Sequence, residues 1–520
     1  MLHMLTKIYG SAVHGVEAIT ITIEVNVGQG TKFFLVGLPD NAVKESAYRI
    51  ETVIKNTGFK MPRLRTVVNM APADIRKAGS AYDLPIATGI LAASRQITCA
   101  VSPEAYVIMG ELSLDGTLRP VRGALPMALR AKQEGFKGIV LPKQNAGEAA
   151  MVEGLDVLGA GHFSEVVNFL EGKAELLPVK GNVPADFLHH QFHFDIDFDE
   201  VKGQQFVKRA MEIAAAGGHN IILIGPPGAG KTMLAKRLPT ILPPLSLAEA
   251  LESTKIHSVA GKLSGHPGMI VHRPFRAPHH TISNYALAGG GTIPVPGEIS
   301  LAHHGILFLD ELPEYRRSAL EVLRQPMEER KVTIARAALS VEFPAGFMLV
   351  TSMNPCPCGY YNHPEKECSC PPGNVQHYLN KLSGPLLDRI DLHIEVTPVQ
   401  PADITGKAVE ETSEIIRRRV MAARNIQLER FAGDEQMVHC NAHMNNRQLQ
   451  RHCRLEPAAR QLLESAMKRL QLSARAYDRI LKVSRTIADL AGHAELGTHH
   501  IAEAIQFRSL DRENWARRTF

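Results

Sequence analysis

Residues 1–170 alternate between short strand-like and helix-like stretches. Residues 19–25 place isoleucine or valine at every second position, which is the period of a strand with one face in a core. Residues 41–57 repeat their apolar side chains at helical spacing. The same patterns predict strands at 32–36, 66–70, 105–110 and 138–141 and helices at 84–94 and 123–134. We therefore expect an α/β domain over residues 1–172.

The apolar runs in the middle of the chain do not alternate. Residues 221–224 and 306–309 are apolar throughout and 347–352 is apolar as far as Val350, as expected for strands that a parallel sheet buries on both faces. Beyond residue 401 helical spacing dominates, and we predict helices at 410–427, 446–451, 457–470, 474–491 and 498–506. The expected organisation is a linker at 173–198, a second α/β domain at 199–400 and a helical domain at 401–520.

A glycine-rich segment follows the apolar run 221–224 and precedes a helix-like stretch. Its glycines let backbone N–H groups turn toward a phosphate group, its lysine can reach the β- and γ-phosphates, and its threonine can hold Mg²⁺. A glycine-rich turn without a ligand is the alternative, but the full set of residues indicates an ATP site. The residues are Gly225, Pro226, Pro227, Gly228, Ala229, Gly230, Lys231 and Thr232.

Two acids and an amide follow the next apolar runs. Asp310 and Glu311 come directly after 306–309, and Asn354 comes just after 347–352. The carboxyl ends of parallel strands are where ligands bind in an open α/β sheet. We expect Asp310 to join the Mg²⁺ site, Glu311 to polarise the attacking water and Asn354 to orient it. A strand that merely ends in solvated acids is the alternative.

A long segment at 257–291 is rich in Gly, Pro and His and poor in helical spacing. It carries Arg273 and Arg276 beside aromatic residues, a combination that suits a nucleic-acid backbone and its bases. A structural insertion that packs on a neighbouring subunit is the alternative. Residues 332–336 and 339–343 alternate like a hairpin, which would place Arg336 near the tip, where it can touch phosphate or be an ordinary surface arginine.

Four of the seven cysteines are crowded into residues 356–370. Two close pairs of thiolates can complete a tetrahedral Zn²⁺ site. Free or oxidisable thiols on a loop are the alternative, because each pair is spaced more tightly than the usual metal motif. The residues are Cys356, Cys358, Cys368 and Cys370.

Two arginines in the last third of the chain are candidates to sense the γ-phosphate. Arg389 follows a short helix and could stabilise transition-state charge in an adjacent subunit, or pair locally with Asp388 or Asp391. Arg475 opens one of the terminal helices and is a second candidate sensor, or else an ordinary surface arginine in the first turn of the helix.

The composition and charge of the chain limit the classes of protein to which it can belong. The chain has 520 residues, 45% of them hydrophobic and 21% charged, and a net charge of +5. Residues 401–520 hold 20 Lys and Arg against 15 Asp and Glu, a difference of +5 that equals the net charge of the whole chain. This excess suits a nucleic-acid surface or a solvated helical face. No stretch reaches the roughly 18 apolar residues of a membrane helix, so we expect a cytoplasmic protein without membrane contact.

The front domain resembles the proteolytic domain of Lon-type proteases, which is a ribosomal S5 domain 2-like fold. The resemblance lies in the sequences KAGSA at 77–81, LRPVRGAL at 118–125 and GIVLP at 138–142. The nucleophile position of that family falls near Ala81, with Ser80 one place away, and its lysine position falls near Leu125. The domain therefore lacks the catalytic dyad, and we expect the Lon fold without peptidase activity.

The ATP-site motifs, Asn354, LLDRID at 386–391 and SARAYDRI at 473–480 resemble an AAA+ ATPase of the magnesium-chelatase and MCM branch. With the Lon-like front domain, RPFRAPHH at 273–280 and the cysteine cluster, the whole chain resembles the ComM/YifB family of magnesium-chelatase-like proteins. This implies an AAA+ P-loop α/β/α domain with a cysteine insert, followed by a helical lid. It also implies a homo-hexameric ring in which Arg389 completes the neighbour's site, and a DNA motor for branch migration in natural transformation.

Two alternatives remain. A chelatase-type ATPase that remodels a protein partner without nucleic acid would share the ATP-site motifs, and stimulation of hydrolysis by DNA distinguishes the two. An ATP-dependent protease would need an activated Ser80, and the missing lysine makes it the weakest reading.

Overall fold

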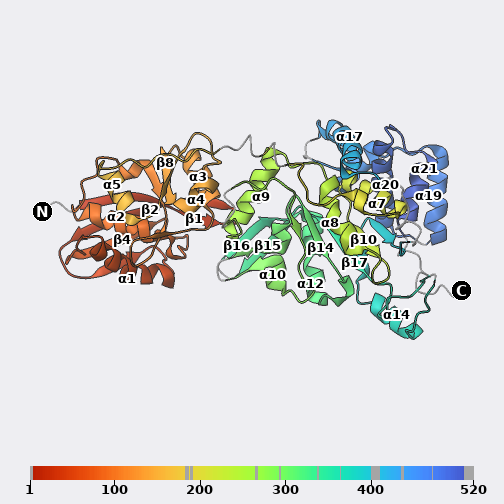
Figure 1. The fold of residues 1–520 in the computed structure, drawn as a ribbon, viewed down its shortest axis with the longest axis horizontal. Helices are drawn as coiled ribbons and strands as arrows, with labels where there is room; N and C mark the ends of the chain where they lie inside the picture. The colour runs from red at the N-terminus through yellow and green to blue at the C-terminus, as the bar shows by residue number, and fades with distance from the viewer. Residues whose placement is uncertain are drawn as a thin grey trace.

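The computed structural model describes residues 4–181, 187, 191–263, 268–291, 294–336, 339–363, 365–399, 410–434, 438–470 and 472–508. They form three bodies in a row (Figure 1). The N-terminal α/β domain lies at one end, a second α/β domain lies in the middle, and a group of helices lies at the other end.

A seven-stranded mixed sheet is the centre of the N-terminal domain. The predicted alternation is confirmed, because Ile21, Ile23 and Val25 of the second strand are fully buried. In sheet order the strands are β3 (Phe33–Val36), β4 (Arg65–Ala71), β2 (Glu17–Gly28), β1 (Met4–His14), β5 (Tyr106–Ile108), β8 (Gly138–Pro142) and β9 (Asp156–Ala160). Its longer helices are α1 (Asn41–Asn56), α2 (Asp83–Ala93) and α3 (Ala124–Gln133), with α4 (Lys143–Ala149) and α5 (Phe163–Leu170) after them.

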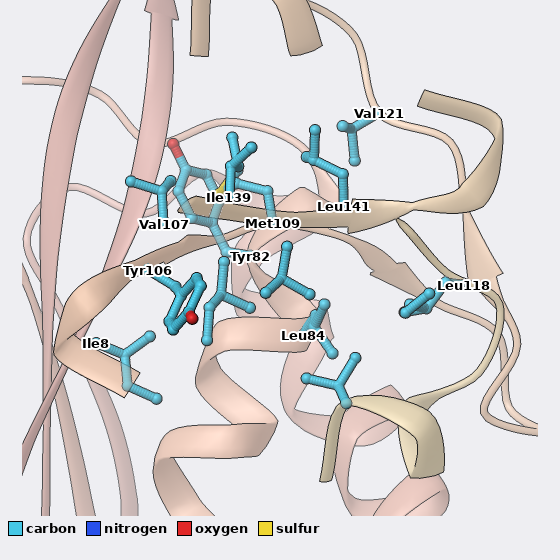
Figure 2. Close-up of a cluster of buried hydrophobic side chains, with 14 of the residues drawn as sticks. Ile8, Tyr82, Leu84, Tyr106, Val107, Met109, Leu118, Val121, Ile139 and Leu141 are labelled. Atoms are coloured by element: carbon cyan, nitrogen blue, oxygen red, sulfur yellow. The ribbon is translucent and has the colours of Figure 1, made fainter. Parts of the chain in front are cut away.

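The core of this domain is apolar where a Lon-type protease has its lysine. Figure 2 shows part of this core, with Tyr82, Leu84 and Leu118 among the buried side chains. Leu125, at the first turn of α3, is fully buried as well. An apolar side chain there cannot activate a nucleophile.

Ser80, the serine near the Lon nucleophile position, has a carboxylate as its partner. Its hydroxyl donates to the carboxylate of Glu111. The ammonium of Lys77, the nearest lysine along the chain, bonds the carbonyl oxygen of Pro72. In the described structure, Ser80 and Lys77 therefore have different hydrogen-bond partners.

A five-stranded parallel sheet is the centre of the second domain. The predicted strands at 221–224, 306–309 and 347–352 are confirmed, and all three are buried throughout. In sheet order the strands are β11 (Phe275–Arg276), β14 (Ile306–Leu309), β17 (Met348–Met353), β10 (Ile221–Ile224) and β18 (Leu392–Glu395). Apolar residues bury both faces of this sheet, one of them beneath the helices α7 (Gln205–Gly217) and α8 (Lys231–Ile241).

The insert at 257–291 is more regular than its composition suggests. The helix α9 (Leu247–Val259) runs into it, and Phe275 and Arg276 pair with β14 as the edge strand of the core sheet. A short helix, α10 (Asn284–Ala288), follows. Residues 264–267 lie outside the described part of the chain.

The predicted hairpin is confirmed. β15 (Lys331–Arg336) and β16 (Leu339–Pro344) pair antiparallel, and Arg336 faces Leu339 at the tip. The side chain of Arg336 itself lies outside the described part of the chain. The helices that precede the hairpin are α12 (Arg317–Val322) and α13 (Arg324–Glu329).

The last body is helical, as predicted. Its helices are α17 (Ser413–Phe431), α18 (Asn446–His452), α19 (Pro457–Leu470), α20 (Ala474–Leu490) and α21 (Thr498–Gln506). Both α17 and α20 pack on α7 of the second domain, and the two bodies share one apolar core. Residues 401–409 and 509–520 of the expected helical domain lie outside the described residues.

The helix α9 joins the N-terminal domain to the middle one (Figure 1). The hydroxyl of Ser258 donates to the carboxylate of Glu148, and the backbone N–H of Gly123 donates to the carbonyl of Ser258 at 3.2 Å. Lys255 pairs with Glu17 at 3.0 Å. Val16, at the turn between β1 and β2, packs into the apolar core of the middle domain. In the described parts of the chain, no helix is both long enough and apolar enough to cross a lipid bilayer.

Candidate functional site

A cavity of about 410 Å³ opens where β10, β14 and β17 end. The predicted ATP-site residues meet here from three separate stretches of sequence, because parallel strands direct their carboxyl ends to the same edge. The lining residues are Pro227, Gly228, Ala229, Gly230, Lys231, Thr232, Met233, Asp310, Glu311, Ser352, Met353 and Asn354.

The phosphate loop depends on its glycines. Gly228 has φ +79° and Gly230 has φ +84°, in the left-handed region that other residues rarely adopt. Gly225 lies against the next strand, where a Cβ would be 2.3 Å from the carbonyl oxygen of Val396. The helix α8 then begins at Lys231, so its first N–H groups face the cavity.

Lys231 brings a buried positive charge to the cavity. Its ammonium donates to the carbonyl oxygens of Gly225 and Pro226 at 2.7 and 2.9 Å, and to Oδ1 of Asn354 at 3.1 Å. Burial lowers the pKa of Lys231, and the nearby Asp310 and Glu311 carboxylates oppose this shift. Its hydrogen-bond partners are neutral oxygens, so the charge remains available to an anion such as a triphosphate.

The Mg²⁺ ligands predicted from sequence lie together. The hydroxyl of Thr232 donates to Oδ2 of Asp310 at 2.8 Å. Ser352 donates to the other oxygen of Asp310, a contact that sequence reasoning missed. Hydroxyl and carboxylate oxygens are the ligands that Mg²⁺ prefers, so the donor set fits this ion.

Glu311 adopts an unusual backbone conformation at the edge of the cavity. Its φ is +54°, rare for a residue with a side chain and often found at functional positions. Its carboxylate is 55% exposed and lies 3.6 Å from Nδ1 of His280. His280 therefore connects the insert to the site, although the sequence offered only its place in a His-rich stretch.

Arg389 is engaged within its own chain. It follows the short helix α15 (Gly384–Leu387) and is 7% exposed. Its guanidinium donates to the carbonyl of Pro385 at 2.6 Å and pairs with Glu328 at 2.5 Å. The local partner is thus Glu328, rather than Asp388 or Asp391, and action on a neighbour's site stays a prediction.

Arg475 lies in the first turn of α20, outside the lining of the cavity. Its side chain is 61% exposed and approaches Oδ2 of Asp388 at 3.4 Å. A flexible exposed arginine is free to change partners, so its role as a phosphate sensor also stays a prediction.

Arg273 and Arg276 are not on an exposed loop, which corrects the location expected from composition. The guanidinium of Arg273 donates to the carbonyls of Pro243 and His304 at 2.6 and 2.7 Å. Arg276 forms a two-pronged ion pair with Glu298, at 2.6 and 2.8 Å. Arg276 lies in β11, which belongs to the core sheet, and Arg273 lies two residues before that strand. Contact of either residue with DNA stays a prediction.

The four predicted cysteine sulfurs lie close together. The Sγ atom of Cys356 is 3.3 Å from that of Cys358 and 3.6 Å from that of Cys368, and Cys358 is 3.5 Å from Cys368. Cys370 Sγ accepts a hydrogen bond from the backbone N–H of Cys358 at 3.4 Å. Zn–S bonds of about 2.3 Å in a tetrahedron place sulfurs about 3.8 Å apart, so the set fits Zn²⁺.

Among the residues that the structure describes, two other groups of possible metal ligands were missed at the level of sequence. Each offers ligand atoms within 4.8 Å of one another. In both, internal hydrogen bonds or ion pairs account for the arrangement. The groups are His493, His499 and His500, and Glu252, His303 and His304.

Three family models match the chain. The model described as magnesium chelatase, subunit ChlI, matches residues 197–404. A model for subunit ChlI of Mg-chelatase matches residues 23–145, and one for its C-terminal part matches residues 410–508.

Individual relatives match over most of the length. The chain is 44% identical to competence protein ComM of Haemophilus influenzae over 511 residues, covering 98% of each chain. It is 43% identical to the uncharacterized protein YifB of Escherichia coli, again over 98% of each. A weaker match, 27% over 159 residues, joins 30% of this chain to 26% of Lon protease 2 of Bacillus subtilis.

Proposed function

We propose, on the premise that this chain belongs to the ComM/YifB family of magnesium-chelatase-like AAA+ proteins, that it is a ring-forming ATPase that moves DNA. The activity we propose is branch migration in homologous recombination during natural transformation. The DNA half of this proposal rests chiefly on the family, since the relative from Haemophilus influenzae is named a competence protein.

ATP hydrolysis is supported by one observation above all, the meeting of Lys231, Thr232, Asp310, Glu311 and Asn354 around one cavity. Mg²⁺ held by Thr232 and Asp310 would neutralise charge on the β- and γ-phosphates. Water attacks the γ-phosphorus. The bond between this atom and the oxygen that bridges the β- and γ-phosphates then breaks, so that ADP leaves. Glu311 accepts the water proton, Asn354 orients the water, and Lys231 binds the phosphate oxygens.

A ring, a hexamer in our proposal, would supply the remaining charge. Arg389 is held by Glu328 within its own chain, so action in a neighbour's site requires this pair to open. Arg475 is exposed and needs no such step. An arginine placed beside the γ-phosphate in this way stabilises the transition state.

The hairpin of β15 and β16 is the DNA-contacting element that we propose, with Arg336 at its tip. A cation near the tip of a hairpin can bind phosphate. Arg273 and Arg276 would support the hairpin indirectly, by holding the insert on the core.

The cysteine cluster is proposed to bind Zn²⁺ as a closed structural centre. All four thiolates belong to one short loop, and none is in a disulfide. A site with four protein ligands leaves no open position, so we assign it a structural role.

The deciding experiment measures ATP hydrolysis by the purified protein with no DNA, single-stranded DNA, duplex and a four-way junction. Lys231→Ala is the blank. We expect DNA to stimulate hydrolysis, and we expect junction dissociation to be lost in Lys231→Ala and Arg389→Ala. Hydrolysis that no DNA changes, together with no binding to DNA at low salt, contradicts the DNA half and leaves the ATPase half intact.

A second candidate function is a chelatase-type ATPase that remodels a protein partner. The observation that favours it is the internal pairing of Arg273 and Arg276, two of the three arginines expected at DNA. The same experiment decides between the two functions, because a protein remodeller does not require DNA for full activity.

A further inference from the structure

The loop that carries the four cysteines, residues 356–370, starts just after the strand β17 ends. Cys356 follows Asn354 by two residues and is fully buried. Asn354 lines the ATP cavity, and its side-chain oxygen accepts a hydrogen bond from Lys231 at 3.1 Å. The first cysteine of this cysteine loop is therefore fixed in the core directly beside the ATP site.

The cysteine loop also touches the phosphate loop, through Gly359. Gly359 has φ +86°, and a Cβ there would lie 2.4 Å from Cδ and 2.8 Å from Cγ of Pro227. The backbone of the cysteine loop thus lies against the proline ring with no side chain between them. Gly225 fixes the start of the phosphate loop against Val396, and Gly359 contacts the same loop two residues later.

Hydrogen bonds to sulfur connect the position of Gly359 to the cysteine cluster. The backbone N–H of Tyr361 donates to Sγ of Cys356 at 3.3 Å, and the N–H of Cys358 donates to Sγ of Cys370 at 3.4 Å. Such bonds stabilise a thiolate, which is the form of cysteine that binds a metal. The N–H of Gly359 donates to the carbonyl of Cys356 at 3.0 Å, so the turn that presents Gly359 to the phosphate loop is closed by the same residues that bring the sulfurs together.

We infer that metal occupancy of the four cysteines controls ATP binding, because the metal-bound cysteine loop holds the phosphate loop in its binding conformation through Gly359. Zn²⁺ is the ion that the donor set fits. Without a metal the sulfurs have no common partner, and the contact between Gly359 and Pro227 is free to loosen. The inference rests on the proposed ATPase function but not on its DNA half, and it gives the zinc centre a regulatory effect besides its structural role.

The test compares the whole protein with and without zinc. Zinc content is measured with a metal-sensitive dye, and affinity for a fluorescent ATP analogue is measured before and after a chelator that binds Zn²⁺ but not Mg²⁺. We expect about one zinc per chain. Its removal should weaken the affinity about 10-fold, which corresponds to a phosphate loop that is in its binding conformation about a tenth of the time. Added Zn²⁺ should restore the affinity, and added Mg²⁺ should not.

Two variants test the inference without a chelator. Cys370→Ser removes one metal ligand, so it should lose zinc and bind the analogue as weakly as the stripped protein. Cys99→Ser is the matched control, because Cys99 lies in the N-terminal domain, and it should change neither zinc content nor affinity.

Gly359→Ala separates the contact with the phosphate loop from the zinc centre itself. This variant keeps all four cysteines, so it should keep its zinc and still bind the analogue weakly. Because zinc and Gly359 act through one contact, removing zinc from Gly359→Ala should weaken the affinity little further.

Four outcomes would overturn the inference. They are a protein that takes up no zinc, an affinity that does not fall when zinc is removed, full additivity of zinc removal and Gly359→Ala, and loss of the whole fold on zinc removal, seen by circular dichroism. A zinc-loaded wild type that neither binds the analogue nor hydrolyses more ATP than Lys231→Ala would instead contradict the proposed ATPase function.

Discussion

Gly359 shows how much a single residue can control at this site. It combines a left-handed backbone with a close approach to Pro227, and either feature excludes a side chain. We expect Gly359→Ala to cost about 1–2 kcal/mol from the backbone alone, with the contact to Pro227 adding to it. The phosphate loop should shift, and affinity for a fluorescent ATP analogue should fall.

The matched control for this substitution is Gly373→Ala. Gly373 lies in the helix α14 (Pro372–Leu379), and a Cβ there meets no atom within 4 Å. This variant should bind the analogue as the wild type does. Unchanged affinity in Gly359→Ala as well would show that the cysteine loop does not support the phosphate loop.

His500 predicts a loss of stability as the pH falls. Burial, with the neighbouring His499 and His493 next, lowers the pKa of His500 to about 4 in the folded protein. Between about pH 6.5 and 4 the unfolded chain binds a proton here and the folded chain does not, so stability decreases as the pH falls through this window. Protonation would also break the hydrogen bond that Nδ1 of His500 accepts from the N–H of Gly497 at the start of α21.

The measurement is thermal unfolding at pH 7 and at pH 5. Other buried histidines contribute in the same direction, so the variant must be compared with the wild type at both values. His500→Asn keeps a hydrogen-bond acceptor but does not titrate, so its thermal stability should fall less between pH 7 and pH 5 than that of the wild type. An equal loss in both proteins would contradict the assignment.

At the same residue scale, sequence predicted the groups that lie in motifs and missed their distant partners. Lys231, Thr232, Asp310, Glu311 and Asn354 were predicted, because their spacing relative to strands is itself informative. Ser352, His280 and Glu328 could not be predicted, since their roles depend on contacts between segments far apart in the chain.

At the scale of elements, the apolar strands and the terminal helices were predicted, whereas the long strand β1, the helix α9 and the strands β11 and β18 were not. The helices of the last body and the buried strands β10, β14 and β17 each carry a clear period or an apolar run. β11 has two residues in a Pro-rich stretch, and β18 carries His393 and Glu395 among its four. Both are strands because they pair with neighbours in the core sheet, which no local pattern reveals.

The helix α3 illustrates an element completed by another. It begins at Gly123, which has no side chain to cap the helix, and the N–H of Leu125 instead donates to Oε1 of Glu148 in α4 at 2.8 Å. The same carboxylate accepts from Ser258. Glu148→Ala should lower the free energy of unfolding by about 1–3 kcal/mol, since it leaves buried donors unpaired.

Chemical denaturation measures this change. Glu148→Gln keeps an acceptor oxygen, so its free energy of unfolding should fall clearly less than that of Glu148→Ala. Equal losses would indicate that the charge of Glu148, rather than its hydrogen bonds, stabilises this region.

The hairpin predicts a salt-dependent effect on DNA. If Arg336 contacts a phosphate, Arg336→Ala should weaken DNA binding to all sequences alike. It should also reduce the steepness of the plot of log K for binding against log salt concentration by about 1. Binding is measured by fluorescence anisotropy at several salt concentrations, with Arg475→Ala as the control arginine. A salt slope equal to that of the wild type would contradict the contact.

At the scale of the whole molecule, an ATP site shared between neighbouring subunits predicts that two inactive variants recover ATPase activity when they are mixed. Lys231→Ala loses its own phosphate site but can still offer Arg389, and Arg389→Ala keeps its phosphate site. In mixed rings of equal amounts, about a quarter of the interfaces should combine both intact residues. Steady-state ATPase rates of the mixture, compared with each variant alone, measure this recovery.

A mixture as inactive as its components would show that Arg389 acts within its own chain, through Glu328. The double variant Lys231→Ala, Arg389→Ala mixed with the wild type serves as the control for subunit exchange, because it offers no intact half to rescue.

The packing of α9 on the N-terminal domain predicts how this protein behaves after proteolytic cleavage between the two domains. Ser258, Lys255 and Val16 join the two bodies by hydrogen bonds, an ion pair and apolar packing, none of which depends on the peptide chain between residues 181 and 191. A protease nick in that interval therefore yields two fragments on a denaturing gel and a single particle in native chromatography. The association of the two domains therefore does not require an intact backbone between them.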